Sequence, residues 1–421
     1  MNELLEDLKW RGLVADSTDE AALSADLDAG PITSYVGFDP TAPSIHFGNL
    51  VQLMVSRRLQ ASGHRPLLLV GGSTGLIGDP KESSERVLNP QEVVEQWVER
   101  IRDQVSKFVD FTGSNAAQVV NNYDWTANLS TLDFLRDVGK HFPVNRMLAR
   151  DVVAKRLEAG ISYTEFSYVL LQSLDYRELY RQYNCTLQTG ASDQWGNITA
   201  GVELIRRTEG ARVHGLCTPL LTKADGTKFG KTETGTMWLD PEMTSPYAFH
   251  QFFLNVEDAK VIEFLKIFGD RDRDEVAELE RQVAEEPFRR AAQRALADDI
   301  TDLVHSPAER RAAVEAAEAL FGRGELDTLD EKTLAQVARE VGAGELASGE
   351  ELPTYIDALV AGGVVDSRSA ARRAITEGGA YVNNTKVTDV DGRLSEAEVL
   401  HGRYVVVRRG KKTVGAVVLQ R

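Results

Sequence analysis

The stretch YVGFDPTAPSIHFGN, residues 35–49, places His46 two residues before Gly48, where an apolar helical pattern begins. A strand-like run, a loop with two prolines and a helix start follow one another here. The first turn of a helix has free backbone N–H groups and the positive end of the helix dipole, so it binds anions such as phosphate. The position of His46 therefore suggests a ligand contact at this junction. A histidine that only caps a surface helix is the alternative.

The strand-like run itself carries polar groups on one face. Alternation places Tyr35, Gly37 and Asp39 opposite Val36 and Phe38. If the apolar pair faces the core, the other face presents a phenol, bare backbone and a carboxylate at the carboxyl end of a strand. Open parallel sheets bind ligands at that end. A solvated edge strand would show the same alternation.

A second set of polar groups follows a helical period. Ser162 and Glu165 have the spacing of a capping box, which predicts a helix start. Tyr168, Gln172 and Asp175 then fall on one face of that helix. Their neighbours are mostly apolar, so the helix should be largely buried, and buried polar groups need partners. A ligand would supply them; a stripe facing solvent is the alternative.

Two lysines, Lys228 and Lys231, flank Phe-Gly in TKADGTKFGKTETG. Lysines between glycines suit a mobile loop that closes on phosphate charge as it develops in a transition state. A pair of surface lysines is the alternative. The earlier stretch GGSTGLIGDP lacks the Gly-Lys-Ser/Thr of a Walker loop and the spacing of a dinucleotide-binding turn, which argues against a dehydrogenase.

The elements that must position these residues lie in the first 240 residues, where short apolar runs alternate with helical patterns. SYVGF, PLLLVGG, AQVVNN, CTLQTG and VHGLCTPLL are expected to be strands. Continuous apolar strands separated by helices predict a parallel sheet covered on both faces. The expected fold class is therefore α/β, with a Rossmann-like parallel-sheet domain followed by a helical domain and a small α+β domain.

Composition predicts four parts: a catalytic domain over 1–240, a helical domain over 246–323, a linker over 324–352 and a small module over 353–421. The linker is acidic and rich in glycine. The last part holds 11 Lys/Arg against 7 Asp/Glu in a chain whose net charge is −16. A basic module on an acidic body is expected when one end contacts a polyanion such as RNA.

The chain also lacks several signals. No run approaches the roughly 18 apolar residues of a membrane helix, and the start MNELLEDLKWRGLV lacks the basic and apolar regions of a secretion signal. The two cysteines, Cys185 and Cys217, have no metal-ligand spacing and fit a reducing compartment. We therefore expect a cytoplasmic protein without a membrane segment or a dedicated metal site.

Together the motifs resemble the bacterial tyrosyl-tRNA synthetases, a family of class I aminoacyl-tRNA synthetases. HFGN, residues 46–49, is similar to the His-Ile-Gly-His signature of the class, and KFGKT, residues 228–232, is similar to its Lys-Met-Ser-Lys-Ser signature. The segments YVGFDPTAPSIH, TEFSYVLLQSLD and SDQWGNITAG are of the tyrosyl type. Residues 353–421 resemble a small RNA-binding domain shared with a ribosomal protein. The resemblance covers almost the whole chain.

The resemblance implies roles for individual residues. Tyr35 and Asp175 would bind the phenol of tyrosine, Gln194 would face its carboxylate and Asp193 would contact the ribose of ATP. The implied tyrosine site comprises Tyr35, Asp39, Asp79, Tyr168, Gln172, Asp175 and Gln194, with Thr74 and Asn122 behind them. The implied catalytic and ATP-binding residues, which contact phosphate or ribose, are Thr41, His46, Gly48, Asn49, Lys81, Arg86, Asp193, Lys228, Lys231 and Thr232.

The implied reaction is the ligation of tyrosine to tRNA. L-tyrosine and ATP, with Mg²⁺ accompanying ATP, would give tyrosyl-adenylate and pyrophosphate, and the tyrosyl group would then pass to the terminal ribose of tRNA. The family implies a homodimer. The chain departs from the pattern at Asn49, where the second histidine of the signature usually stands, and at Ala191, where a glycine is common. A tryptophanyl-type synthetase and a catalytically inactive RNA-binding homologue are the alternatives.

Overall fold

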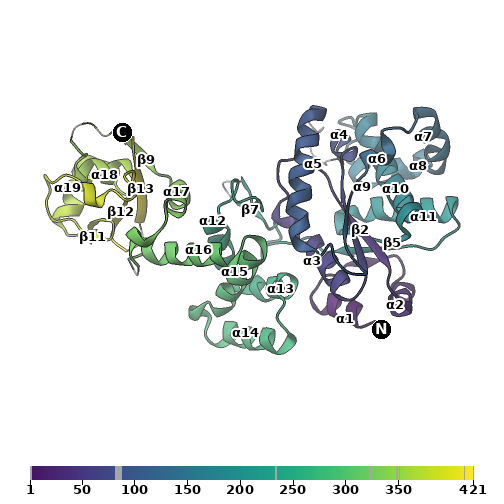
Figure 1. The fold of residues 1–421 in the computed structure, drawn as a ribbon, viewed down its shortest axis with the longest axis horizontal. Coiled ribbons are helices and arrows are strands. Elements are labelled where there is room, and N and C mark those ends of the chain that lie inside the picture. The colour runs from purple at the N-terminus through teal and green to yellow at the C-terminus, as the bar shows by residue number, and fades with distance from the viewer. Residues whose placement is uncertain are drawn as a thin grey trace. The chain divides into compact units, whose positions relative to one another are not determined.

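The computed structural model of the chain contains two compact units, each assembled from two segments (Figure 1). The first unit comprises Met1–Met243 with Glu257–Ala292, and the second comprises Thr244–Val256 with Gln293–Arg421. The structure describes residues 2–80, 88–232, 235–322, 324–347, 349, 351–411 and 413–420. In the part of the chain so described, no helix is long and apolar enough to cross a membrane.

The first unit is built on a six-stranded sheet in the order β1-β6-β5-β2-β3-β4. The strand β1 (Asp16–Ser17) is short and pairs antiparallel with β6. The other neighbours pair in parallel, as expected from their apolar sequences. These strands are β2 (Thr33–Phe38), β3 (Arg65–Val70), β4 (Gln118–Asn121), β5 (Cys185–Ala191) and β6 (His214–Thr218). The order reverses between β2 and β5, which makes their carboxyl ends the switch point where open sheets bind ligands.

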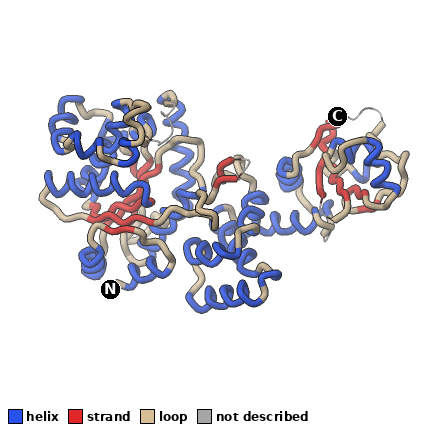
Figure 2. The backbone as a smooth tube through the Cα atoms, turned by 180° about the vertical axis from the view of Figure 1, so that it is seen from behind, coloured by secondary structure: helices blue, strands red, loops and turns tan. Residues whose placement is uncertain are grey.

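Helices cover both faces of this sheet, as Figure 2 shows for the strands lying between helical layers. On one face lie α3 (Phe47–Ala61) and α5 (Gln91–Val105), and on the other lie α10 (Tyr163–Tyr183) and α11 (Trp195–Thr208) (Figure 1). Ser162 caps α10 by accepting a hydrogen bond from the backbone of Glu165. The remaining helices of this unit are α1 (Glu3–Trp10), α2 (Glu20–Ala29), α4 (Thr74–Ile77), α6 (Tyr123–Thr126), α7 (Thr131–Asp137), α8 (Val144–Leu148), α9 (Asp151–Ala154), α13 (Asp258–Phe268) and α14 (Arg273–Glu285).

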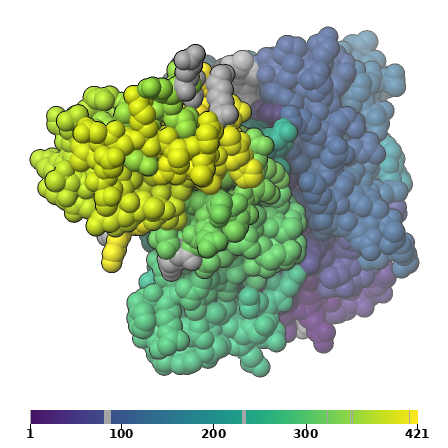
Figure 3. Space-filling model, turned by 60° about the vertical axis from the view of Figure 1, so that its left-hand side comes forward, coloured from purple at the N-terminus to yellow at the C-terminus, as the bar shows by residue number. Residues whose placement is uncertain are grey.

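The second unit contains an α+β module on a five-stranded sheet in the order β11-β10-β12-β13-β9. Two helices, α18 (Tyr355–Ala361) and α19 (Arg368–Thr376), contribute to its apolar core. The strands are β9 (Gly344–Ala347), β10 (Ala380–Val382), β11 (Thr385–Lys386), β12 (Tyr404–Arg409) and β13 (Thr413–Gln420). In the space-filling view this module is a closely packed body, yellow-green to yellow (Figure 3).

Four more helices precede the module in the second unit. They are α12 (Pro246–Leu254), α15 (Ala291–Val304), α16 (Pro307–Leu320) and α17 (Glu331–Glu340). The compact units thus divide the expected helical domain over 246–323, because α12 belongs to the second unit while α13 and α14 belong to the first.

The segment 324–352, expected as a linker, instead carries α17 and β9. Leu334 and Val337 of α17 are buried in a core shared with α16 and β12, and β9 pairs in parallel with β13. The acidic and glycine-rich composition suggested a tether, but the apolar residues of α17 recur at helical spacing and bury one face of the helix.

Candidate active site

A single carboxylate, Asp39, connects the carboxyl end of β2 to the start of α4 and to α10. Asp39 Oδ1 accepts a hydrogen bond from Thr74 Oγ1 at 2.6 Å, and its Oδ2 accepts one from the hydroxyl of Tyr168, also at 2.6 Å. A Cβ at Gly71 would lie 2.3 Å from Asp39 Oδ1 and 2.2 Å from Thr74 Oγ1. Glycine at position 71 is therefore required for this approach.

A second carboxylate, Asp175, lies deeper in the same region, with 2% of its surface exposed. Asn122 Nδ2 donates to its Oδ2 at 3.0 Å, and Trp125 Nε1 donates to its Oδ1 at 2.9 Å. Burial raises the pKa of Asp175 to about 7; the two hydrogen bonds oppose that shift and the charge of Asp39 adds to it. Asp175 is thus a buried acceptor whose charge is only partly compensated.

The hydroxyl of Tyr35 is also buried, and it lacks a hydrogen-bond partner among the described residues. The side chain is 3% exposed, and its ring lies 5.2 Å from that of Tyr176. Burial, and then the charge of Asp175, raise the pKa of Tyr35 well above its ordinary value. A buried polar group without a partner costs about 1–3 kcal/mol, which a bound ligand can relieve.

A third carboxylate, Asp79, lies in a cluster of amides. Gln194 Nε2 donates to its Oδ2 at 2.7 Å and Asn197 Nδ2 donates to its Oδ1 at 3.3 Å. Asn197 Nδ2 also donates to Gln194 Oε1 at 2.8 Å. Separately, Gln172 Oε1 on α10 is buried and has no hydrogen-bond partner in the described part of the chain. It is an acceptor suited to a cationic donor such as an ammonium group.

The first signature segment is the start of α3. His46 is the N-cap residue and is exposed, and its backbone N–H donates to Asn49 Oδ1 at 3.1 Å. A Cβ at Gly48 would lie 2.9 Å from His46 Cε1, so the imidazole lies directly against this glycine. In this chain Asn49 therefore helps to close the first turn of α3.

The second signature segment is packed against the first through aromatic rings. The ring of Phe229 lies 5.4 Å from that of Phe47 and 4.4 Å from that of Phe264. Gly230 has a φ of 87°, and a Cβ there would lie 3.2 Å from the ring of Phe47. The backbone of Phe47 also donates to the carbonyl of Met237, beyond the loop, at 2.9 Å.

The remaining predicted residues are only partly described. Thr41, Asp193 and Lys228 are exposed, and Ala191 is the last residue of β5. Lys231 and Thr232 form the strand β7 (Lys231–Thr232), which pairs with β8 (Gly235–Thr236), but their side chains lie outside the described part. Lys81 and Arg86 lie outside the described residues altogether.

Sequence reasoning missed Trp125 and Asn197, which contact the predicted residues Asp175 and Asp79. It also missed Arg150, which contacts Asn197. Trp125 had a local signal, because an indole follows closely on the strand that ends at Asn121. Asn197 stands in the quoted segment SDQWGNITAG without being singled out. Arg150 had no signal, because its partner Asn197 lies 47 residues away in the chain.

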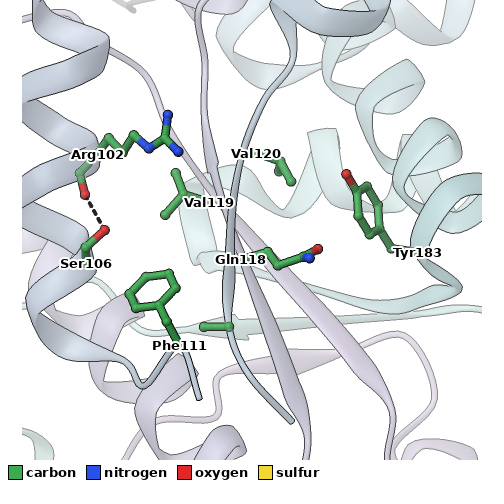
Figure 4. Close-up of a pocket in the computed structure, with 8 residues that line it drawn as sticks. Arg102, Ser106, Phe111, Gln118, Val119, Val120 and Tyr183 are labelled. Carbon is green, nitrogen blue, oxygen red and sulfur yellow. Dashed lines mark hydrogen bonds between the residues drawn. The ribbon is translucent and has the colours of Figure 1, made fainter. Parts of the chain in front are cut away.

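A separate hollow opens beside the free edge of β4 (Figure 4). Arg102, Ser106 and Phe111 line one side of the strand, and Tyr183 of α10 lines the other. None of the predicted site residues lines this hollow. Within the described residues, no group of three His, Cys, Asp or Glu side chains could hold a metal ion.

Comparisons with known proteins match two family models to the chain. The family described as tRNA synthetases class I (W and Y) matches residues 27–322, and the Tyrosine--tRNA ligase SYY-like C-terminal domain matches residues 334–416. The tyrosine–tRNA ligase of Cutibacterium acnes is 67% identical over 417 residues, which cover 99% of this chain and 100% of that protein. That of Streptomyces avermitilis is 58% identical over 420 residues, 99% of each.

A solved structure with the same architecture is a C-terminally truncated mitochondrial tyrosyl-tRNA synthetase of Aspergillus nidulans. It is 29% identical, has a TM-score of 0.68, and the match covers 76% of this chain and 94% of that chain. The tryptophanyl-type and inactive alternatives are not favoured, because both of these relatives are tyrosine–tRNA ligases that match the chain over at least 99% of their length. The chain therefore belongs to the tyrosine–tRNA ligases, a family of class I aminoacyl-tRNA synthetases.

Proposed function

We propose that the two under-partnered groups Tyr35 and Asp175 form the phenol-binding end of the tyrosine site in this ligase. The observation that carries the proposal is the buried, partnerless hydroxyl of Tyr35 together with the buried carboxylate of Asp175. A phenol O–H that donates to Asp175 and accepts from Tyr35 would satisfy both groups. Asn122 and Trp125 would hold the carboxylate in place from the other side.

The other end of tyrosine would lie where acceptors are concentrated. Asp79, with Tyr168 and the partnerless oxygen of Gln172, would bind the ammonium group. Gln194, whose amide contacts Asp79, would face the substrate carboxylate, and Asp39 would lie close to the reacting groups through its bonds to Thr74 and Tyr168.

ATP would be bound at the start of α3. The exposed imidazole of His46, the amide of Asn49 and the N-terminal backbone at Gly48 would contact phosphates and ribose, together with Thr41 and Asp193. Lys228, Lys231 and Thr232 would contact the leaving pyrophosphate, with Lys81 and Arg86 as further cations. Mg²⁺ would arrive bound to ATP and neutralise phosphate charge.

The chemistry needs no protein nucleophile. The substrate carboxylate would attack the α-phosphorus, the bond to the bridging oxygen would break, and pyrophosphate would leave with its charge held by the lysines. The terminal ribose hydroxyl of tRNA would then attack the carbonyl carbon, expel AMP and form the ester. Catalysis would therefore consist of positioning and charge stabilisation.

Two surfaces are candidates for binding tRNA and a second copy of the chain. We propose that the basic module of the second unit binds tRNA, with Arg372 and Arg373 exposed on α19. We also propose a cytoplasmic homodimer that buries exposed apolar side chains, because exposed apolar surface often marks an interface. The side chains proposed for this interface are the exposed ones between residues 132 and 163, namely Leu132, Leu135, Val144, Leu148, Leu157 and Tyr163.

The test is exchange of labelled pyrophosphate into ATP by the full-length protein, with tyrosine, phenylalanine or tryptophan as the amino acid. At micromolar concentrations of amino acid, we expect only tyrosine to support the exchange. Equal exchange with phenylalanine would contradict the phenol site at Tyr35 and Asp175. Exchange supported only by tryptophan would contradict the choice of substrate.

A further inference from the structure

A chain of hydrogen bonds leads from Arg150 to the carboxylate of Asp79. The guanidinium of Arg150 donates through Nη2 to Asn197 Oδ1. The amide nitrogen of Asn197 donates to Gln194 Oε1 at 2.8 Å and to Asp79 Oδ1 at 3.3 Å. Gln194 Nε2 then donates to Asp79 Oδ2 at 2.7 Å. Both oxygens of the carboxylate thus receive an amide donor.

The orientation of the amides in this series of hydrogen bonds is set by the groups at its two ends, Arg150 and Asp79. Arginine has only donors, so Asn197 must turn its oxygen toward Arg150 and its nitrogen toward Gln194 and Asp79. That nitrogen obliges Gln194 to present its oxygen, and the nitrogen of Gln194 is then left for Asp79. The carboxylate of Asp79 has only acceptors and requires the same orientation from the other end, so Arg150 and Asp79 together fix the two side-chain amides.

Arg150 packs closely against Gly196. A Cβ at Gly196 would lie 3.2 Å from Arg150 Nη2 and 3.3 Å from its Nε, so the guanidinium lies over this glycine in the first turn of α11. The side chain is partly buried. Burial lowers the pKa of Arg150 and the charge of Asp79 opposes that shift, which places the two charges within electrostatic range.

We propose that Arg150 is a positioning residue of the aminoacyl site, which fixes Asn197 and Gln194 so that Asp79 is held ready for the ammonium group of the substrate. The inference rests on the proposed binding of that ammonium group by Asp79. Arg150 acts through the amides and not by contact with tyrosine. Its effect is therefore on amino-acid affinity and not on the transfer step.

The experiment measures ligand affinity in the full-length protein. The variants are Arg150→Met, Arg150→Lys and the matched surface control Arg146→Met, which removes an exposed cation from α8. The ligands are tyrosine, tyramine, which keeps the phenol and ammonium groups, and 3-(4-hydroxyphenyl)propionate, which lacks the ammonium group. Titration calorimetry gives each Kd, and aminoacylation of tRNA is measured separately.

We expect Arg150→Met to weaken tyrosine and tyramine about tenfold, the effect of one lost or misdirected hydrogen bond. The propionate should change about twofold or less, which also shows that the pocket is folded. Arg150→Lys keeps a donor and should recover most of the affinity. The inference would be overturned if Arg150→Met bound tyrosine and tyramine as tightly as Arg146→Met does and lost only tRNA charging. Arg150 would then be assigned to tRNA binding.

Asp79→Asn separates this inference from the assignment on which it rests. If Asp79 binds the ammonium group, Asp79→Asn weakens tyramine strongly, and adding Arg150→Met to it causes little further loss. An unchanged tyramine affinity in Asp79→Asn refutes the ammonium site itself. If Asp79→Asn lowers the affinity for tyramine and Arg150→Met does not, only the positioning role of Arg150 is refuted.

Discussion

Replacing Asp175 with asparagine should change the free energy of unfolding more favourably at pH 8 than at pH 5. The folded pKa of about 7 lies above the ordinary value of 3.8 because the carboxylate is buried. A group whose pKa is raised on folding contributes stability that is fully present below its unfolded pKa and is lost as the pH rises through its folded pKa. Wild-type protein therefore loses this contribution between about pH 4 and pH 7.

The size follows from the two pKa values. A shift of about three units corresponds to about 4 kcal/mol in total, and about 2–3 kcal/mol of it falls between pH 5 and pH 8. Asparagine cannot ionise, so the Asp175→Asn variant lacks this pH dependence. Its amide nitrogen must face a donor, Asn122 or Trp125, which costs about 1–3 kcal/mol at every pH. Because this cost is the same at every pH, the change of the free-energy difference with pH reports only the ionisation of Asp175.

Urea unfolding followed by tryptophan fluorescence is the suitable assay, because all five tryptophans lie in the first unit. The measured quantity is the difference in unfolding free energy between variant and wild type at pH 5, 6, 7 and 8. Asp124→Asn is the control, since it removes an exposed carboxylate from α6 close by. A difference for Asp175→Asn that stays flat over this range would refute the reasoning about its burial.

Four further outcomes are expected. Tyr35→Phe should lower the preference for tyrosine over phenylalanine about tenfold in kcat/KM for pyrophosphate exchange; an unchanged ratio would remove Tyr35 from the phenol site. Lys228→Ala should slow adenylate formation about 100-fold in single-turnover assays, with the tyrosine Kd within about twofold; a collapse of tyrosine affinity would contradict this. Arg372→Glu with Arg373→Glu should reduce tRNA charging and its salt dependence while exchange is unchanged. Tyr163→Asp should shift the protein toward monomer in sedimentation, and an unaltered oligomer would place the interface elsewhere.

Much of the fold was predictable because the sheet strands are short, continuous and apolar. The runs before Asp39 and Gly71 end where the chain must turn, and the structure has β2 and β3 there. The segment around α17 was mispredicted, because its composition suggested a tether while its buried residues, Leu334 and Val337, follow a helical period. In that segment, the helical spacing of the apolar residues predicted the structure better than the amino-acid composition did.

The site was predictable where polar residues stand at the ends of strands or on one helical face, as with Tyr168 and Asp175. Trp125 and Arg150 were not, because each acts on a residue that is remote in sequence: Trp125 on Asp175, and Arg150 on Asn197. Spacing along the chain reports neighbours on one element, whereas these contacts depend on how separate elements are packed.

The ring contact between Phe229 and Phe47 makes the two signature segments a mechanical linkage. Phe47 is the first residue of α3 and directly follows His46, while Phe229 directly follows Lys228. A movement of the lysine loop must therefore either carry the start of α3 with it or exchange this contact and the one to Phe264, each worth about 0.5–1.5 kcal/mol. Release of the loop from this packed position would therefore be opposed by the two ring contacts, and smaller apolar residues at Phe264 would weaken that opposition without changing any charge in the site.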